Sequence, residues 1–175
     1  FGKALLVGLM LSTAAFVTPT EARDIVVGVR AGPASIDPHF TPQGPQISAM
    51  RNIYDTLVSR DDNLQEQAGL AVSWKPIDDL TWEFKLRAGV KFHNGTPFTA
   101  SDVKYSIERV PTVVGITGGL RAYVKRIVSV TVVDDLTVHF KTNSPAAGLP
   151  ADLARVFIVS EKAAKGKSSD DFIKG

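Results

Sequence analysis

The residue types that most often do chemistry are few and scattered in this chain. The 175-residue sequence has no cysteine and only three histidines, His39, His93 and His139. None of the three has a second histidine one helical turn away, whereas a metal site needs several convergent ligands. Without cysteine, the chain cannot form thiol nucleophiles, zinc thiolate sites or disulfides. We therefore predict no metal site and no cofactor.

Paired carboxylates occur at several places, such as Asp61-Asp62, Asp78-Asp79 and Asp134-Asp135. Each pair stands in a stretch typical of a turn, and side chains adjacent in sequence rarely converge on one substrate. The G-x-S-x-G, H-E-x-x-H and G-x-G-x-x-G motifs of hydrolases, metalloproteases and dinucleotide-binding enzymes are absent from the sequence. We predict that the chain is not an enzyme, with a secreted hydrolase as the alternative.

The charged residues argue against a nucleic-acid partner. Lys and Arg number 20 and Asp and Glu number 18, and the basic residues form neither a run nor a stripe. Nucleic-acid-binding proteins gather their basic residues on one face or along one helix. We therefore predict no nucleic-acid binding.

The most regular part of the sequence is residues 80–110, LTWEFKLRAGVKFHNGTPFTASDVKYSIERV. From Thr81 to Arg87 apolar and charged residues alternate, which predicts a half-buried strand because successive side chains of a strand point to opposite faces. Asn94-Gly95 suits a tight turn, since both residues tolerate positive φ. The apolar face of this strand consists of Trp82, Phe84 and Leu86.

A helix follows in the same block. Thr99 is a suitable N-cap, and Asp102 places a negative charge near the positive end of the helix dipole. The helix is expected from Ala100 to about Val110, where Pro111 ends it. Its buried stripe, at the spacing of an amphipathic helix, is predicted to be Val103, Ile107 and Val110.

The rest of the chain gives shorter patterns. Apolar spacing predicts a helix over residues 46–58, and alternation on both sides of Asp134-Asp135 predicts a β-hairpin over residues 127–141. We expect irregular chain over residues 70–76. Short strands are predicted over residues 24–30 and 156–160, and further helices over 120–126, 145–153 and 161–165.

The first 22 residues have the pattern of a secretory signal peptide. Lys3 supplies a positive charge, Ala4 to Leu11 is an uncharged apolar stretch, and Thr20-Glu21-Ala22 is a small-x-small cleavage pattern. The apolar stretch is shorter than the roughly 20 residues of a membrane-spanning helix. We predict a signal peptide over residues 1–22 and a periplasmic location, with a buried N-terminal helix as the alternative.

The 80–110 block resembles the signature segment of the family 5 periplasmic solute-binding proteins, the peptide- and nickel-binding group that serves ABC importers. The resemblance extends over nearly all of residues 24–175. It implies an α/β fold, the N-terminal part of a two-lobed periplasmic-binding-protein fold (type II, cluster C-like) with mixed sheets and flanking helices. Residues 23–51 and 143–175 are expected to form part of the first ligand-binding lobe and residues 52–142 an outer subdomain, with the second lobe absent.

The resemblance also implies where a ligand would lie, because family members bind it between two lobes, and clefts between domains are common small-molecule sites. The loop after the first strand matches best, since Gly32 allows close backbone approach and Ser35 offers a hydroxyl and an N–H group. A structural turn is the alternative for that loop, and a solvent-exposed position for the polar side chains that follow. The predicted ligand-binding residues are Gly32, Pro33, Ala34, Ser35, Gln43, Gln46 and Arg121.

The resemblance finally implies a function. The chain is expected to act as a periplasmic solute-binding protein, a monomer at full length, that captures a peptide or related small solute and delivers it to an inner-membrane ABC permease. Binding and lobe closure, without chemistry, would be the mechanism. The alternatives are the secreted hydrolase and a truncated structural or interaction module that binds no solute.

Overall fold

The computed structural model describes Gly28, residues 31–114 and residues 119–174. The predicted signal peptide lies outside this part of the chain, as does the predicted strand of residues 24–30 apart from Gly28. Within the described residues, no helix combines the length and the apolar composition that crossing a membrane requires.

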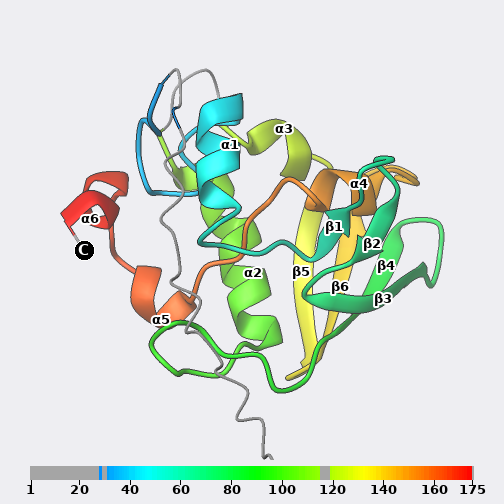
Figure 1. Cartoon of the computed structure of the whole chain (residues 1–175). Coiled ribbons are helices and arrows are strands. Elements are labelled where there is room, and N and C mark those ends of the chain that lie inside the picture. Colours follow the sequence, from blue (N-terminus) through cyan, green and yellow to red (C-terminus); the bar gives the residue numbers. More distant parts are fainter. Residues whose placement is uncertain (1–27, 29–30, 115–118, 175) are drawn as a thin grey trace, which may run out of the picture.

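A four-stranded sheet forms one side of the molecule (Figure 1). Its order is β3-β4-β6-β5, and every neighbouring pair is antiparallel. A separate two-stranded ribbon, β1 (Val58–Arg60) with β2 (Glu66–Ala68), is antiparallel too, so the sheets of the described residues are antiparallel where we predicted mixed ones. The four strands are β3 (Ala71–Pro76), β4 (Thr81–Leu86), β5 (Ile127–Asp134) and β6 (Thr137–Thr142).

The predicted alternation in the central strand is confirmed. Phe84 of β4 is fully buried and Leu86 nearly so. Phe84 faces Trp74 of β3 and Val138 of β6 in the strand register, and its ring meets that of Phe140 edge-on at a centroid distance of 5.1 Å. Aromatic side chains bury large apolar areas and favour this edge-to-face geometry, so they anchor the core of the sheet.

Helix α2 (Ala100–Arg109) follows Thr99, as predicted. The Asp102 carboxylate accepts hydrogen bonds from the backbone N–H of Thr99 (2.9 Å) and from its hydroxyl (3.1 Å), which closes the first turn. Pro111 lies in a 3₁₀ turn over Val110–Thr112 where the helix ends. The predicted stripe of Val103, Ile107 and Val110 is buried.

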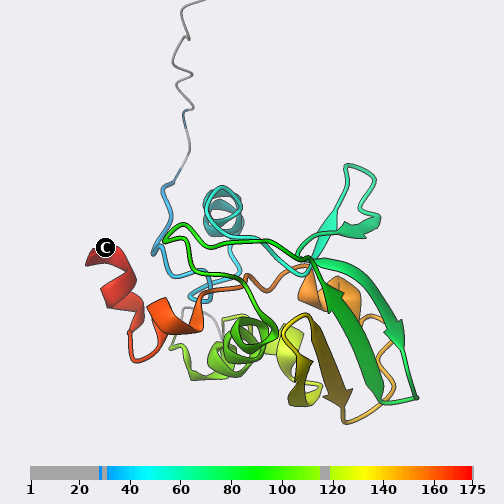
Figure 2. The same ribbon diagram turned by 90° about the horizontal axis from the view of Figure 1, so that it is seen from below.

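Helix α2 lies between the sheet and the C-terminal helices, as the two views in Figures 1 and 2 agree. The hairpin of β5 and β6 and short helices close to the predicted ranges 120–126 and 161–165 are present. The remaining helices are α1 (Gly44–Met50), α3 (Arg121–Val124), α4 (Leu149–Leu153), α5 (Glu161–Ala164) and α6 (Ser169–Lys174).

The tight turn predicted at Asn94-Gly95 in the 80–110 block is also present. Gly95 has φ +81°, and its N–H donates to the carbonyl of Phe92 at 2.8 Å. A side chain at this position would be strained, since L residues rarely adopt positive φ. The turn leads the chain from the sheet back to the start of α2.

Four predicted elements are wrong in extent or type. The helix predicted over 46–58 ends at Met50, where the Asn52 side chain donates to the carbonyl of Ser48 at 2.8 Å. The chain predicted to be irregular over 70–76 contains β3. Residues 156–160 are buried, but they make one isolated bridge, between Thr56 and Phe157, in place of a strand. Of the helix predicted over 145–153, only α4 forms.

Candidate functional site

A buried cluster of polar side chains joins the loop before α1 to the end of α2. Arg109 donates two hydrogen bonds to Asp37, from Nη1 to Oδ1 at 2.9 Å and from Nη2 to Oδ2 at 2.7 Å. Its Nη1 also lies 3.0 Å from Nδ1 of His39. Asp37 and His39 are 0% exposed and Arg109 is 7% exposed. We call these three residues the Asp37–His39–Arg109 cluster.

The contacts of His39 fix its tautomer. Its Nε2 lies 2.8 Å from the carbonyl oxygen of Phe157, which can only accept, so Nε2 carries the proton. Nδ1 is then the acceptor for Arg109. Burial lowers the pKa of His39 from 6.5 to about 4, and the nearby Arg109 charge acts in the same direction. His39 is therefore neutral near pH 7, with both ring nitrogens engaged.

Asp37 stays ionised at the same pH. Burial alone would raise the pKa of its carboxyl, but hydrogen bonds from Arg109 and Ser169 outweigh burial and hold that pKa below its ordinary value. Its Oδ1 also accepts the backbone N–H of His39 at 3.0 Å. The carboxylate is thus saturated with donors from its own loop, from α2 and from α6.

Helix α6 packs on the cluster through two side chains. The Ser169 hydroxyl donates to Oδ2 of Asp37 at 2.6 Å. The guanidinium of Arg109 lies over the ring of Phe172, with its carbon 4.8 Å from the ring centroid, within the range of a cation–π contact. Ser169 of α6 therefore bonds a carboxylate that lies 132 positions earlier in the sequence.

The first predicted ligand loop divides into an exposed and a buried part. Gly32, Pro33 and Ala34 are exposed, whereas Ser35 is buried. The Ser35 hydroxyl accepts the backbone N–H of Asp37 at 3.0 Å, so it is turned toward the cluster. Three of the four residues predicted in this loop are therefore open to solvent.

The second predicted loop divides in the same way. Gln43 is exposed and stands at the N-cap of α1. Gln46 is 2% exposed, and its amide bonds the loop backbone, with Nε2 donating to the carbonyls of Ser35 and Asp37 and Oε1 accepting from the Ser35 N–H. The Gln46 side chain thus holds the loop from within the protein.

Arg121, the third prediction, is the exposed first residue of α3. Gly119, two residues earlier, has φ +58°, and a methyl group on it would lie 3.5 Å from the carbonyl oxygen of His39. The structure therefore brings the start of α3 against the loop that carries the cluster. His39 and Phe40, which Gly119 approaches, lie between the first two predicted segments in the sequence.

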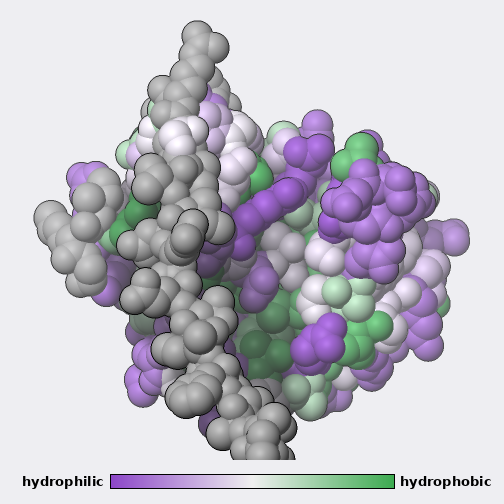
Figure 3. Space-filling model, in the orientation of Figure 1, coloured by the Kyte–Doolittle hydropathy of each residue, from purple (hydrophilic) through white to green (hydrophobic). Residues whose placement is uncertain are grey.

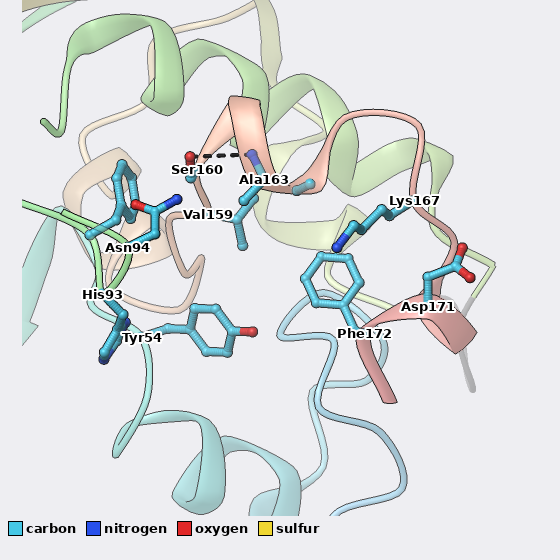
Figure 4. Close-up of a pocket in the computed structure, with 11 residues that line it drawn as sticks. Tyr54, His93, Asn94, Val159, Ser160, Ala163, Lys167, Asp171 and Phe172 are labelled. Carbon is cyan, nitrogen blue, oxygen red and sulfur yellow. Dashed lines mark hydrogen bonds between the residues drawn. The ribbon is translucent and has the colours of Figure 1, made fainter. Parts of the chain in front are cut away.

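Two hollows flank α6. One is a pocket of about 250 Å³, into whose space Tyr54 and Phe172 face in Figure 4. The other, of about 300 Å³, is lined by Phe40, Arg109 and Ser169 among others. Neither is lined by a predicted ligand-binding residue. Figure 3 shows apolar surface gathered in a hollow on the face seen in Figure 1.

The described residues contain no group of three or more histidine or acidic side chains that could hold a metal ion. His93 is exposed, and His139 pairs with Glu83 on the sheet at 3.2 Å. His39 cannot serve as a general base in this conformation, because its ring nitrogens face a carbonyl and a guanidinium. The arrangement suits holding a loop in place rather than proton transfer.

Sequence reasoning missed the cluster. Arg109 lies off the apolar stripe predicted for α2 and was assigned no role. A signal was present, because Ser35, Asp37, His39 and Thr41 stand at every second position and all four are buried. Alternation predicts a shared face for polar residues as it does for apolar ones. Polar residues between two prolines are usually taken for exposed loop, which hid the pattern.

Comparison with known proteins gives a consistent result. The sequence model of the family described as bacterial extracellular solute-binding proteins, family 5 Middle, matches residues 65–174, more than half of the chain. The periplasmic murein peptide-binding protein MppA of Escherichia coli K12 is 36% identical over 90 residues, which are 51% of this chain and 17% of that protein. A probable peptide ABC transporter periplasmic-binding protein, y4tO of Sinorhizobium fredii, is 35% identical over 129 residues, 72% of this chain and 24% of that protein.

Solved structures agree with the sequence relatives. The murein tripeptide binding protein MppA of Escherichia coli superposes with a TM-score of 0.70 at 25% identity, covering 80% of this chain and 31% of that one. The binding protein MoaA of A. tumefaciens R10, in complex with mannopinic acid, gives 0.68 at 30% identity, with coverages of 79% and 29%. The chain therefore spans between 17% and 31% of the length of these relatives.

Proposed function

Because the chain belongs to the bacterial extracellular solute-binding proteins of family 5, we propose that its gene product captures a peptide or related small solute in the periplasm for an inner-membrane ABC permease. The observation that carries this proposal is the family match over residues 65–174, supported by the structural likeness to peptide- and opine-binding relatives. The relatives are named as binding proteins rather than enzymes, and we propose that this protein likewise binds without chemistry.

The proposed contact surface consists of the exposed parts of the predicted loops. Gly32, Pro33 and Ala34 are exposed next to Ser35, which is buried and bonded to Gln46. Gln43 and Arg121 are exposed on adjoining segments. A guanidinium can pair with a ligand carboxylate through two parallel hydrogen bonds, which suits peptides and opines alike. Ser35 and Gln46 are assigned a supporting role, since their polar side-chain atoms are turned to the loop backbone.

The lobes are proposed as the family resemblance implies them. Residues 23–51 and 143–175 contribute to the first ligand-binding lobe, and residues 52–142 form the outer subdomain. The signal peptide of residues 1–22 directs export, and the full-length product acts as a monomer. Ligand-driven closure would then favour the conformation that the permease recognises.

The test is mass spectrometry of the solute that co-purifies with the full-length gene product expressed in a bacterial periplasm. We expect one peptide or opine-like solute per protein, released by denaturation, and rebinding of that solute to the refolded protein in calorimetry. Turnover of the solute, or a protein free of any bound solute that also fails to rebind periplasmic extract, would contradict the proposal.

A pair of variants locates the contact surface. Ala34→Arg places a long side chain on the exposed loop, whereas Val128→Arg places the same side chain on the sheet at a residue that is 57% exposed. We expect the first to weaken solute binding roughly tenfold or more, since one well-placed clash outweighs 1.4 kcal/mol. The second should bind as the wild type does. Equal solute binding by both variants would show that the loop is not part of the solute site.

A further inference from the structure

The loop of residues 31–43 has an exposed stretch and a buried part, and the two have different roles. Its exposed stretch, 32–34, belongs to the proposed contact surface, while Asp37 and His39 lie in the buried cluster. An exposed loop rich in glycine and proline has little packing of its own to define one conformation. Whatever fixes the exposed stretch must therefore act from the buried side.

We propose that Arg109 is a positioning residue for the solute site, holding the loop of residues 31–43 in its binding conformation through Asp37 and His39 without touching the solute. This inference rests on the proposed function, because it concerns the surface offered to the solute. It adds Arg109 of α2, the helix of the 80–110 block, to a site that was predicted from loops alone.

The geometry explains why an arginine is required. Its planar fork fills both oxygens of Asp37 in parallel and still reaches Nδ1 of His39. A lysine ammonium is a point charge on a flexible stem and cannot reproduce this arrangement. Arg109→Lys should therefore keep the charge balance of the cluster but lose the alignment of its two partners.

The cluster transmits this alignment to the loop through backbone hydrogen bonds. Asp37 Oδ1 receives the N–H of His39, and the Ser35 hydroxyl receives the N–H of Asp37. Gln46 then ties the backbone of Ser35 at both its N–H and its carbonyl. The chain of contacts runs without a gap from Arg109 to Ser35, the neighbour of the exposed stretch.

The competing interpretation is that the cluster only adds global stability. The two interpretations differ in what happens when stability is lost elsewhere. Val138→Ala removes buried volume in the centre of β6, away from the loop, and serves as the matched control. Temperature and urea are adjusted so that the control and Arg109→Lys have equal unfolding free energies when they are compared.

The experiment measures amide hydrogen exchange of Ser35, Asp37 and His39 in the full-length gene product, together with calorimetric affinity for trialanine. For Arg109→Lys we expect exchange at these amides to be roughly tenfold faster than in Val138→Ala, and affinity to be roughly tenfold weaker, as the loss of one charged hydrogen bond implies. Arg109→Met should show the same pattern more strongly. If it does not fold, Arg109→Lys decides alone.

One outcome overturns the positioning role, and another separates it from the proposed function. Exchange at the three amides that matches the control overturns the positioning role, even if trialanine binds. If the wild type fails to bind trialanine while Arg109→Lys accelerates exchange only in the loop, peptide binding is in doubt but the positioning of the loop stands.

Discussion

His39 shows how burial shifts the pKa of a titratable side chain. In the folded chain its pKa falls to about 4 because the ring is buried, whereas in the unfolded chain it returns to about 6.5. Between these two values the unfolded state binds a proton that the native state does not. The free energy of unfolding must therefore rise with pH across this window and fall as the pH drops through it.

We predict that lowering the pH from 7 to 4.5 removes about 2 kcal/mol of unfolding free energy through His39 alone. The Asp37 carboxyl does not titrate in this window, because its pKa lies below 3.8. The measurement is urea unfolding at several pH values, compared between wild type, His39→Gln and His93→Gln. His39→Gln should be less stable at pH 7 but lose less stability on acidification. The exposed His93 variant should keep the wild-type slope, and an unchanged slope in His39→Gln would contradict the assignment.

At the level of single residues, the sequence predicted the apolar core better than the polar one. Phe84, Val103 and Ile107 were identified from their spacing alone and are buried. Arg109 was not predicted to be buried, since it lies off the apolar stripe and basic residues are mostly exposed. Its burial depends on Asp37, 72 residues earlier, and no local pattern records such a partner.

Among the elements, the start of α2 is hydrogen-bonded to the start of α5. Besides closing the first turn, Asp102 accepts the backbone N–H of Glu161 through Oδ1 at 2.9 Å. One side chain therefore caps α2 and fixes the start of α5, whose own N-cap is Ser160. The sequence predicted the first role but not the second.

We predict that Asp102→Ala lowers the free energy of unfolding by about 1–3 kcal/mol, because it removes a helix cap and leaves the part-buried N–H of Glu161 without this acceptor. The control is Glu108→Ala on the same helix, which removes an exposed ion pair with Lys104 at 3.9 Å. Urea unfolding measures both. Equal losses in the two variants would mean that the cap contributes no more than a surface charge does.

The predicted element boundaries were wrong where tertiary contacts override the local sequence pattern. The spacing of Ile47, Met50 and Leu57 suits one long helix, but Ile53 is 42% exposed and the chain turns away to pair Thr56 with Phe157. Strand β3 was missed because a bulge between Ala71 and Ser73 breaks its alternation. The bridge between Thr56 and Phe157 joins segments far apart in sequence, whereas β3 pairs with β4, the next strand along the chain.

Across the whole molecule, the proposed subdomain boundary is crossed by many contacts. The N–H of Ile158 donates to the carbonyl of Asp55 at 2.9 Å, and the N–H of Val159 donates to the hydroxyl of Ser106 at the same distance. The ion pair of Arg109 with Asp37 crosses the boundary as well. Outer-subdomain and lobe residues thus share one buried region, and in Figure 2 helix α2 of the outer subdomain lies between the sheet and the C-terminal helices.

We predict that the described part of the chain unfolds in a single cooperative step. Both tryptophans, Trp74 and Trp82, lie in the sheet, so fluorescence reports the outer subdomain, while amide exchange of Ile158 and Val159 reports the lobe segment. A shared core makes partial unfolding costly, since it would expose apolar surface and buried charges together. The urea midpoints from the two probes should coincide. In Ser106→Ala the midpoints should move down together, because the lost hydrogen bond belongs to one cooperative unit. A lobe segment that opens at lower urea than the sheet would show that residues 52–142 fold on their own.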